Sequence, residues 1–182
     1  MKLEILSTSP ENTKKIGYKL SRFLSQGDVV FLLGELGGGK TTFISGVAEG
    51  LKIKNSISSP SFTLINVYDF IKDKIKNRLV HCDLYRIDGF KDIPDIGIED
   101  YIYDKKSIVF IEWGIFLKEK ISKNYFEIKF EYFFENSDSE NETQDLNQKR
   151  KITFIANNSY WKQKLEVFKK QINNDIIQYQ IF

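Results

Sequence analysis

Hydrophobic residues follow two different periods along the first two thirds of the chain, and together they predict an α/β fold. Mostly apolar runs at 29–33, 79–83 and 108–112 are typical of strands buried on both faces of a parallel sheet. Helical spacing predicts one helix that begins near Pro10, after a capping hydroxyl, and a second from residue 42. Their apolar positions are Ile16, Leu20, Phe23 and Leu24 in the first helix and Phe43, Ile44, Val47 and Leu51 in the second.

The segments between these elements carry loop and turn signals. Residues 56–63 are rich in hydroxyl groups and contain Pro60, so they predict a loop, and residues 64–70 look extended. Residues 71–78 have the charge and turn character of a hairpin connection to the next strand. Residues 85–101 predict a connection with one or two short helices.

The last third of the chain follows another pattern. Phe126, Ile128, Phe130 and Tyr132 alternate with charged residues, and residues 152–154 resume the alternation, which predicts an antiparallel hairpin. Between these strands, residues 136–149 hold a single large aliphatic residue and predict a long solvated loop. After Tyr160, an amphipathic helix is predicted, which either packs on the sheet or presents its lysine-rich face to a partner or RNA. Its apolar positions are Trp161, Leu165, Phe168 and Ile172.

Composition narrows the class of protein without choosing a partner. A chain of 182 residues suits one domain. A net charge of +2 indicates neither nucleic-acid binding nor membrane binding. Cys82 is the only cysteine, so no intramolecular disulfide or thiolate zinc cluster can form. Neither a signal-like N-terminus nor a membrane-spanning run is seen, so the expected location is the cytoplasm.

Residues 34–42, GELGGGKTT, match the phosphate-loop pattern of glycine, four free positions and Gly-Lys-Ser/Thr. The predicted strand before the loop and helix after it supply the required context. Glycines let the backbone amides approach a polyphosphate at a helix N-terminus. Lys40 would supply charge to the β and γ phosphates, and the Thr41 hydroxyl would join a Mg²⁺ shell. The loop therefore predicts a bound nucleotide.

The apolar runs at 79–83 and 108–112 each end in an acid, Asp83 and Glu112. The acids are thus expected at the strand edge where open α/β sheets bind ligands. Beside a phosphate loop, either acid could hold Mg²⁺ or orient water. Arg86 suits two roles, a contact to the γ phosphate or a structural salt bridge. His81 is the only histidine, and a packed or hydrogen-bonded structural role is expected for it.

Four motifs follow one another along the chain: GDVVFLLGELGGGKTT at 27–42, SPSFTL at 59–64, HCDLYR at 81–86 and IEW at 111–113. In order and spacing they resemble the bacterial TsaE family. The resemblance covers residues 1–155, and it implies a role in forming threonylcarbamoyladenosine on tRNA. It implies a three-layer P-loop NTPase whose mostly parallel central sheet is extended by an antiparallel C-terminal hairpin. The ATPase domain would span residues 1–158, with the helix and tail at 159–182 belonging to it.

The resemblance also implies an activity and partners. The protein would hydrolyse ATP with Mg²⁺, weakly on its own, and would work with the TsaD and TsaB proteins. These proteins transfer the threonylcarbamoyl group to N6 of adenosine 37 in tRNAs that read ANN codons, so tRNA would be met through the complex. No membrane partner is implied.

Residue by residue, the resemblance assigns three overlapping sets. The catalytic set is Lys40, Asp83 and Glu112, and the Mg²⁺ set is Thr41, Asp83 and Glu112. The nucleotide set is Glu35, Leu36, Gly37, Gly38, Gly39, Lys40, Thr41, Thr42, Ser61, Arg86 and Trp113.

The sequence departs from the family pattern at a few positions. Glu35 and Gly38 replace an aspartate and an alanine at free positions of the loop, so phosphate binding should survive. Ser61 replaces a threonine and keeps its hydroxyl, and Cys82 replaces a phenylalanine at a position expected to face the core. Gly114 stands where the family commonly has proline.

Two other functions fit the phosphate loop. One is a binding module in which ATP or ADP merely switches the loop at residues 58–63, and the other is a small-molecule kinase. The kinase is weakened because no arginine-rich lid or acceptor-binding insertion is seen. A GTPase is disfavoured because the chain has neither an Asn-Lys-x-Asp nor an Asp-x-x-Gly motif.

Overall fold

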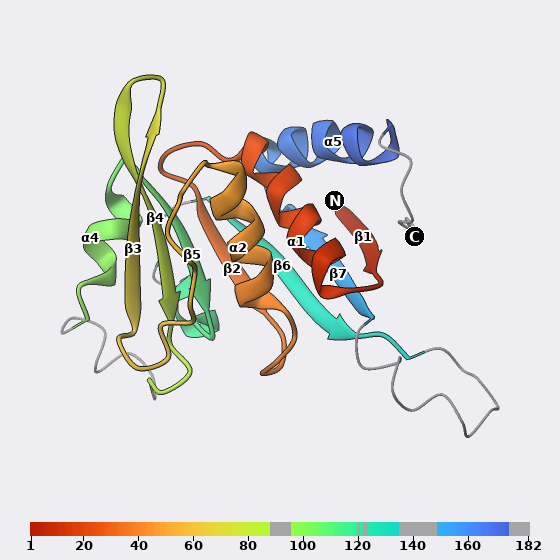
Figure 1. The fold of residues 1–182 in the computed structure, drawn as a ribbon, viewed down its shortest axis with the longest axis horizontal. Helices are drawn as coiled ribbons and strands as arrows, with labels where there is room; N and C mark the ends of the chain where they lie inside the picture. The colour runs from red at the N-terminus through yellow and green to blue at the C-terminus, as the bar shows by residue number, and fades with distance from the viewer. Residues whose placement is uncertain (88–95, 120, 122–123, 135–148, 175–182) are drawn as a thin grey trace.

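The structure, a computed structural model, describes residues 1–87, 96–119, 121, 124–134 and 149–174. These residues form a seven-stranded sheet with the strand order β1-β7-β6-β2-β5-β4-β3. Figure 1 shows the helices α1 and α2 lying side by side in front of the sheet, with α5 beside them and α4 at the far end.

The centre of the sheet is parallel. Strand β2 (Val29–Leu33) lies between β5 (Ser107–Glu112) and β6 (Tyr125–Tyr132) and is parallel to both. Strand β4 (Ile75–Asp83) is parallel to β5 on its other side. The carboxyl ends of these four strands therefore meet at one edge, where ligands of open α/β sheets bind.

Both outer parts of the sheet are antiparallel. Strand β3 (Ile65–Lys72) pairs with β4, while β7 (Arg150–Ile155) pairs with β6 and β1 (Lys2–Ser7) pairs with β7. The predicted mostly parallel sheet with an antiparallel C-terminal hairpin is thus confirmed. Strand β1 was not predicted, although the alternating burial of Leu3 and Ile5 is the pattern of a half-buried strand.

The turn between β3 and β4 corrects one prediction. The connection was expected over residues 71–78, but β3 runs to Lys72 and β4 begins at Ile75. Only Asp73 and Lys74 form the turn, and both have positive φ angles, 53° and 63°. Such two-residue turns match the twist of a hairpin, so the strands continue up to them and lengthen the hairpin.

One face of the sheet is covered by three helices, α1 (Pro10–Leu20), α2 (Lys40–Gly50) and α5 (Ser159–Asn174). Helix α1 begins as predicted, because the Ser9 side chain accepts a hydrogen bond from the Asn12 amide and proline occupies the first turn. In α5 the Trp161 ring stacks on Phe126 of β6, with ring centroids 4.6 Å apart. The apolar stripe of α5 therefore packs on the sheet, which is the first of the two roles considered for this helix.

The other face is covered over β2, β5 and β4 by α4 (Ile98–Tyr103) and a 3-10 turn, η3 (Ile115–Glu119). Ile98, Ile102 and Leu117 pack there against a second apolar cluster that includes Cys82. Burial raises the pKa of the Cys82 thiol far above its usual value. The predicted three layers and the inward position of Cys82 are confirmed. The predicted loop at 136–149 falls almost wholly outside the described residues.

Candidate functional site

The phosphate loop connects the end of β2 to the start of α2, at the carboxyl edge of the sheet. Two of its glycines are required by geometry. Gly39 caps α2 with a φ of 96°, in the left-handed region that favours glycine. A Cβ on Gly34 would lie 2.2 Å from the Phe130 carbonyl oxygen of β6, so only glycine lets the loop pass so close to that strand. Side chains at these positions would distort the loop.

Lys40 is the first residue of α2, and its side chain folds back under the loop. The Lys40 Nζ donates hydrogen bonds to the carbonyl oxygens of Gly34 (2.9 Å) and Glu35 (2.8 Å). It lies 3.7 Å from Glu112 Oε2 and 4.8 Å from the centre of the Trp113 ring. Burial lowers the pKa of the Lys40 ammonium, and the carboxylates of Glu112 and Asp83 offset part of this shift. The lysine is therefore a buried cation with a carboxylate close by.

The two predicted acids lie side by side. Asp83 ends β4, Glu112 ends β5, and the parallel register pairs these two residues directly. Both are buried, with 4% of each residue exposed. Two strands that end together thus bring both carboxylates next to Lys40, as the sequence pattern predicted.

The serine-rich loop reaches Asp83 from the side. Ser59 Oγ and Ser61 Oγ donate to the same oxygen, Asp83 Oδ2, at 3.0 and 2.7 Å. The other oxygen, Oδ1, accepts from the Tyr85 amide at 3.1 Å. Ser61 was predicted at the site from its motif, whereas the contact of Ser59 was not predicted. The hydroxyls hold this loop against the acid rather than against the phosphate loop.

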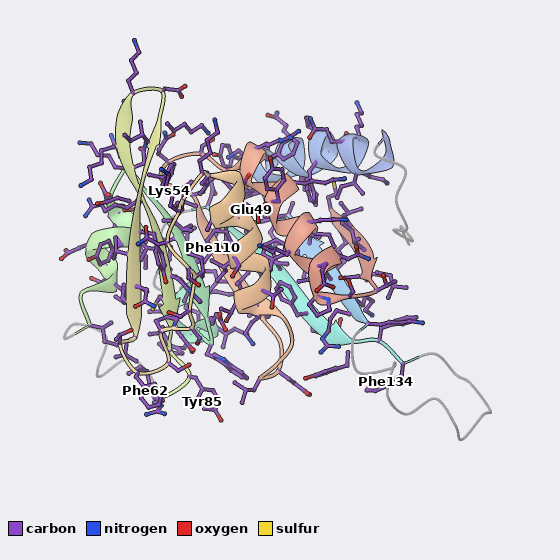
Figure 2. The ribbon with its side chains drawn as sticks, in the orientation of Figure 1. Glu49, Lys54, Phe62, Tyr85, Phe110 and Phe134 are labelled. Carbon is purple, nitrogen blue, oxygen red and sulfur yellow. The ribbon has the colours of Figure 1, made fainter. Side chains whose placement is uncertain are left out.

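Aromatic side chains border the site. Trp113 has a positive φ of 60°, and its ring meets that of Tyr85 edge to face, with centroids 5.1 Å apart. The Arg86 guanidinium lies 4.3 Å from the centre of the Phe62 ring. No ion pair joins Arg86 to another described residue, so the salt bridge weighed for it is not seen within that part of the chain. In Figure 2, Phe62 and Tyr85 lie along the edge of the molecule that carries the phosphate loop.

The sequence did not predict the contacts that β6 and β7 make with the outer side of the phosphate loop. Tyr132 OH donates to the Leu36 carbonyl oxygen at 3.2 Å, and an Arg150 nitrogen donates to that of Gly37 at 3.4 Å. The Arg150 guanidinium also lies 4.0 Å from the centre of the Tyr132 ring. The exposed residues Glu35, Leu36 and Gly37 are thereby tied to the sheet, whereas Thr41 and Thr42 lie half-buried at the start of α2.

The donor set fits a Mg²⁺ ion that is bound together with a nucleotide. Thr41, Asp83 and Glu112 offer oxygen atoms, which Mg²⁺ prefers. Thr41 follows Lys40 in α2, and the two carboxylates lie near the Lys40 ammonium. Within the described residues, no group of three or more His, Cys, Asp or Glu side chains could hold a metal by itself. A hydroxyl and one or two carboxylates are sufficient protein ligands when phosphate oxygens and water complete the shell.

A parallel sheet whose central strand delivers a glycine-rich loop into a covering helix defines a P-loop NTPase fold. The family model "Threonylcarbamoyl adenosine biosynthesis protein TsaE" matches residues 7–144 of this chain. The chain belongs to the TsaE family, and the resemblance in the motifs is confirmed. The role of this family lies in tRNA threonylcarbamoyladenosine biosynthesis.

Individual relatives agree with the family match. The TsaE protein of Treponema pallidum is 38% identical over 62% of this chain and 78% of its own length. The TsaE protein of Bacillus subtilis is 35% identical over 67% of this chain and 73% of its own. The crystal structure of Bacillus subtilis YdiB matches with a TM-score of 0.71 at 27% identity, covering 94% of this chain and 96% of that one.

In the part of the chain that the structure describes, no helix is both long enough and apolar enough to cross a membrane.

Proposed function

We propose that this protein is a Mg²⁺-dependent ATPase that acts with the TsaD and TsaB proteins in the N6-threonylcarbamoylation of adenosine 37 in tRNAs reading ANN codons. The proposal places it in the cytoplasm, and tRNA is met through the complex. The observation that carries it is the convergence of Lys40, Asp83 and Glu112 beneath the phosphate loop. Family membership supplies the pathway.

The chain's own residues divide the work. The amides at the start of α2 and the Lys40 ammonium bind the β and γ phosphates and stabilise the charge that develops as the γ phosphoryl group leaves. Thr41 and Asp83 would hold Mg²⁺, which when bound neutralises phosphate charge. Glu112 faces the same space, with Oε2 3.7 Å from the lysine, and accepts a hydrogen bond from the attacking water. Trp113 and Arg86 border the nucleotide.

The test is MgATP hydrolysis and tRNA modification by the purified protein, with and without TsaD and TsaB. Slow turnover alone and faster turnover with both partners is the expected result. A Lys40→Ala variant loses both hydrolysis and stimulation, because the ammonium is the only cation seated inside the loop among the described residues. Normal stimulated turnover in that variant would contradict the proposed ATPase function.

A nucleotide-switched binding module is the second candidate, and one contact favours it. The Ser59 and Ser61 hydroxyls bind Asp83, the acid that we assign to Mg²⁺, so bound MgATP would compete with the serine-rich loop for the same oxygen. A Glu112→Gln variant separates the two functions. If it binds ATP without hydrolysing it and still supports repeated rounds of tRNA modification, switching alone is sufficient.

A further inference from the structure

The one histidine of the chain touches the candidate catalytic centre. His81 lies on β4, two residues before Asp83, so both side chains point to the same face of the sheet. Its Nε2 lies 2.8 Å from Oε1 of Glu112, on the neighbouring strand. The ring is fully buried, with 0% of the residue exposed. His81 has no role in the ATPase mechanism proposed above, whereas Glu112 does, and this contact joins the two residues.

The hydrogen bond defines the tautomer of the ring. A ring lone pair directed at a carboxylate oxygen would be repelled, so Nε2 carries the hydrogen and donates it to Oε1. The other nitrogen, Nδ1, has no hydrogen-bond partner among the described residues and is buried. Nδ1 is thus an unsatisfied buried polar atom. An apolar side chain at this position would avoid that cost, so packing alone does not account for a histidine here.

The consequence falls on the orientation of Glu112. One carboxylate oxygen, Oε1, is engaged by His81, while the other, Oε2, faces Lys40 at 3.7 Å. Without the ring, Oε1 loses its hydrogen bond and the carboxylate is free to rotate away from this orientation. The histidine keeps one oxygen engaged on the sheet side and leaves the other directed toward the phosphate loop.

We propose that His81 is a positioning residue, which holds Glu112 so that Oε2 stays directed at the reacting phosphate and water. This inference rests on the proposed ATP hydrolysis and deepens it. His81 itself touches neither phosphate nor metal in this scheme. Its effect should therefore fall on turnover rather than on MgATP binding.

Two amide variants form a matched pair. In His81→Gln the side-chain nitrogen reaches about as far as Nε2, whereas in His81→Asn it reaches only about as far as Nδ1 and cannot meet Glu112. With both partner proteins present, His81→Asn should lower kcat about 10- to 100-fold, as is typical when the hydrogen-bond partner of an active-site ligand is lost. The KM for MgATP should stay within about 2-fold, because the phosphate loop is intact. His81→Gln should recover most of the turnover.

A double-mutant cycle separates positioning from general packing. In a Glu112→Gln background, His81→Asn should cause little further loss, since the residue that it positions is already disabled. Thermal unfolding of each variant shows how much folded protein is assayed. Unchanged kcat in His81→Asn, no recovery in an equally stable His81→Gln, or fully additive losses would each overturn the proposal.

A second measurement does not depend on ATP hydrolysis. Because the chain has one histidine, ¹⁵N-histidine labelling gives a single imidazole spectrum. The expected spectrum shows hydrogen on Nε2, and Glu112→Gln should move this hydrogen to lower frequency as a charge-assisted bond becomes a neutral one. A ring protonated on Nδ1 alone, or one insensitive to Glu112→Gln, contradicts the inference. Absence of turnover in the wild type with this spectrum intact would instead count against the proposed ATPase.

Discussion

The two ends of β2 each carry a lysine beside a buried carboxylate, Lys40 being buried and Lys164 half-buried, and the two pairs are built differently. Before the strand, Lys164 of α5 donates to Asp28 Oδ2 at 2.7 Å. After the strand, Lys40 of α2 lies 3.7 Å from Glu112 Oε2 and donates instead to loop carbonyls. Burial lowers the pKa of both lysines, and a carboxylate offsets part of each shift. Similar groups are thus placed at both ends.

The difference lies in how completely each carboxylate is satisfied. Asp28 accepts from Lys164, from the Ser25 amide at 2.8 Å and from Tyr160 OH at 2.7 Å, so both oxygens are engaged. Glu112 has a protein hydrogen bond on Oε1 alone among the described residues. Breaking a fully hydrogen-bonded ion pair destabilises a fold, whereas an incompletely paired buried charge marks a candidate ligand site. The comparison assigns stability to the first pair and chemistry to the second.

Replacing each lysine by methionine should separate these roles most clearly. Lys40→Met should lower stimulated ATP hydrolysis by about 100- to 1,000-fold, the usual cost of losing one electrostatic stabiliser of a transition state. Its unfolding free energy should fall by less than that of Lys164→Met, because Lys40 lies 3.7 Å from its carboxylate whereas Lys164 lies 2.7 Å from Asp28. Lys164→Met should show the reverse pattern. Parallel turnover assays and urea unfolding test both, and equal loss of activity in the two variants would remove the distinction.

Removing the charge of the saturated acid should cost the fold more than removing that of an acid at the site. Asp28→Asn leaves the half-buried Lys164 beside a neutral amide and should lower the unfolding free energy by about 2 kcal/mol, as is typical of a hydrogen bond between charged groups. Asp83→Asn is the control, because its partners are two serine hydroxyls and one amide, and it should cost about 1 kcal/mol. Urea unfolding compares the two. Both acids have both oxygens engaged, so equal destabilisation would show that the ion pair with Lys164 does not decide the effect.

The Tyr160 hydroxyl gives the saturated pair a pH signature. Burial and the hydrogen bond to Asp28 raise the pKa of Tyr160 well above its usual value. Tyr160→Phe should cost about 1.5 kcal/mol below pH 10, as is typical of a hydrogen bond to a charged group. A raised pKa means that this contribution is complete below the unfolded-state value of about 10 and is lost as the pH rises further. The difference between wild type and variant should therefore shrink above pH 10, and a constant difference would contradict the assignment.

The smallest expected effect concerns the serine-rich loop that contacts Asp83, next to the Lys40–Glu112 pair. Ser59→Ala removes one of the two hydroxyls on Asp83 Oδ2 and leaves Ser61 in place. If the loop must leave Asp83 when MgATP binds, the affinity for MgATP should rise by up to about 5-fold, equivalent to about 1 kcal/mol for one hydrogen bond. Fluorescence of Trp113, next to Lys40, can follow the titration. Ser25→Ala, in the saturated cluster, is the control and should leave the affinity unchanged.

Much of the fold could be predicted from local pattern. Strand β2, the loop and α2 follow from apolar runs, glycines and helical spacing, because these depend on neighbours a few residues apart. The carboxyl-edge position of Asp83 and Glu112 follows from strands that end in an acid. Strand β1 and the length of the β3–β4 hairpin were missed. Strand β1 is at the edge of the sheet, and its one strand partner, β7, is distant in the sequence, with Lys2 opposite Ile155. The turn residues Asp73 and Lys74 gave no strong signal.

Amino-acid sequence by itself determined the chemistry that is available to this protein: a phosphate loop, a lysine, a hydroxyl and two acids at strand ends. Only the tertiary structure decided how these groups meet. His81 and Glu112 are separated by 31 residues, and Lys164 and Asp28 by 136, yet each pair lies within hydrogen-bond distance. Periodicity reports which face a residue takes, whereas the partner on that face is set by sheet order and helix packing, which depend on the whole chain.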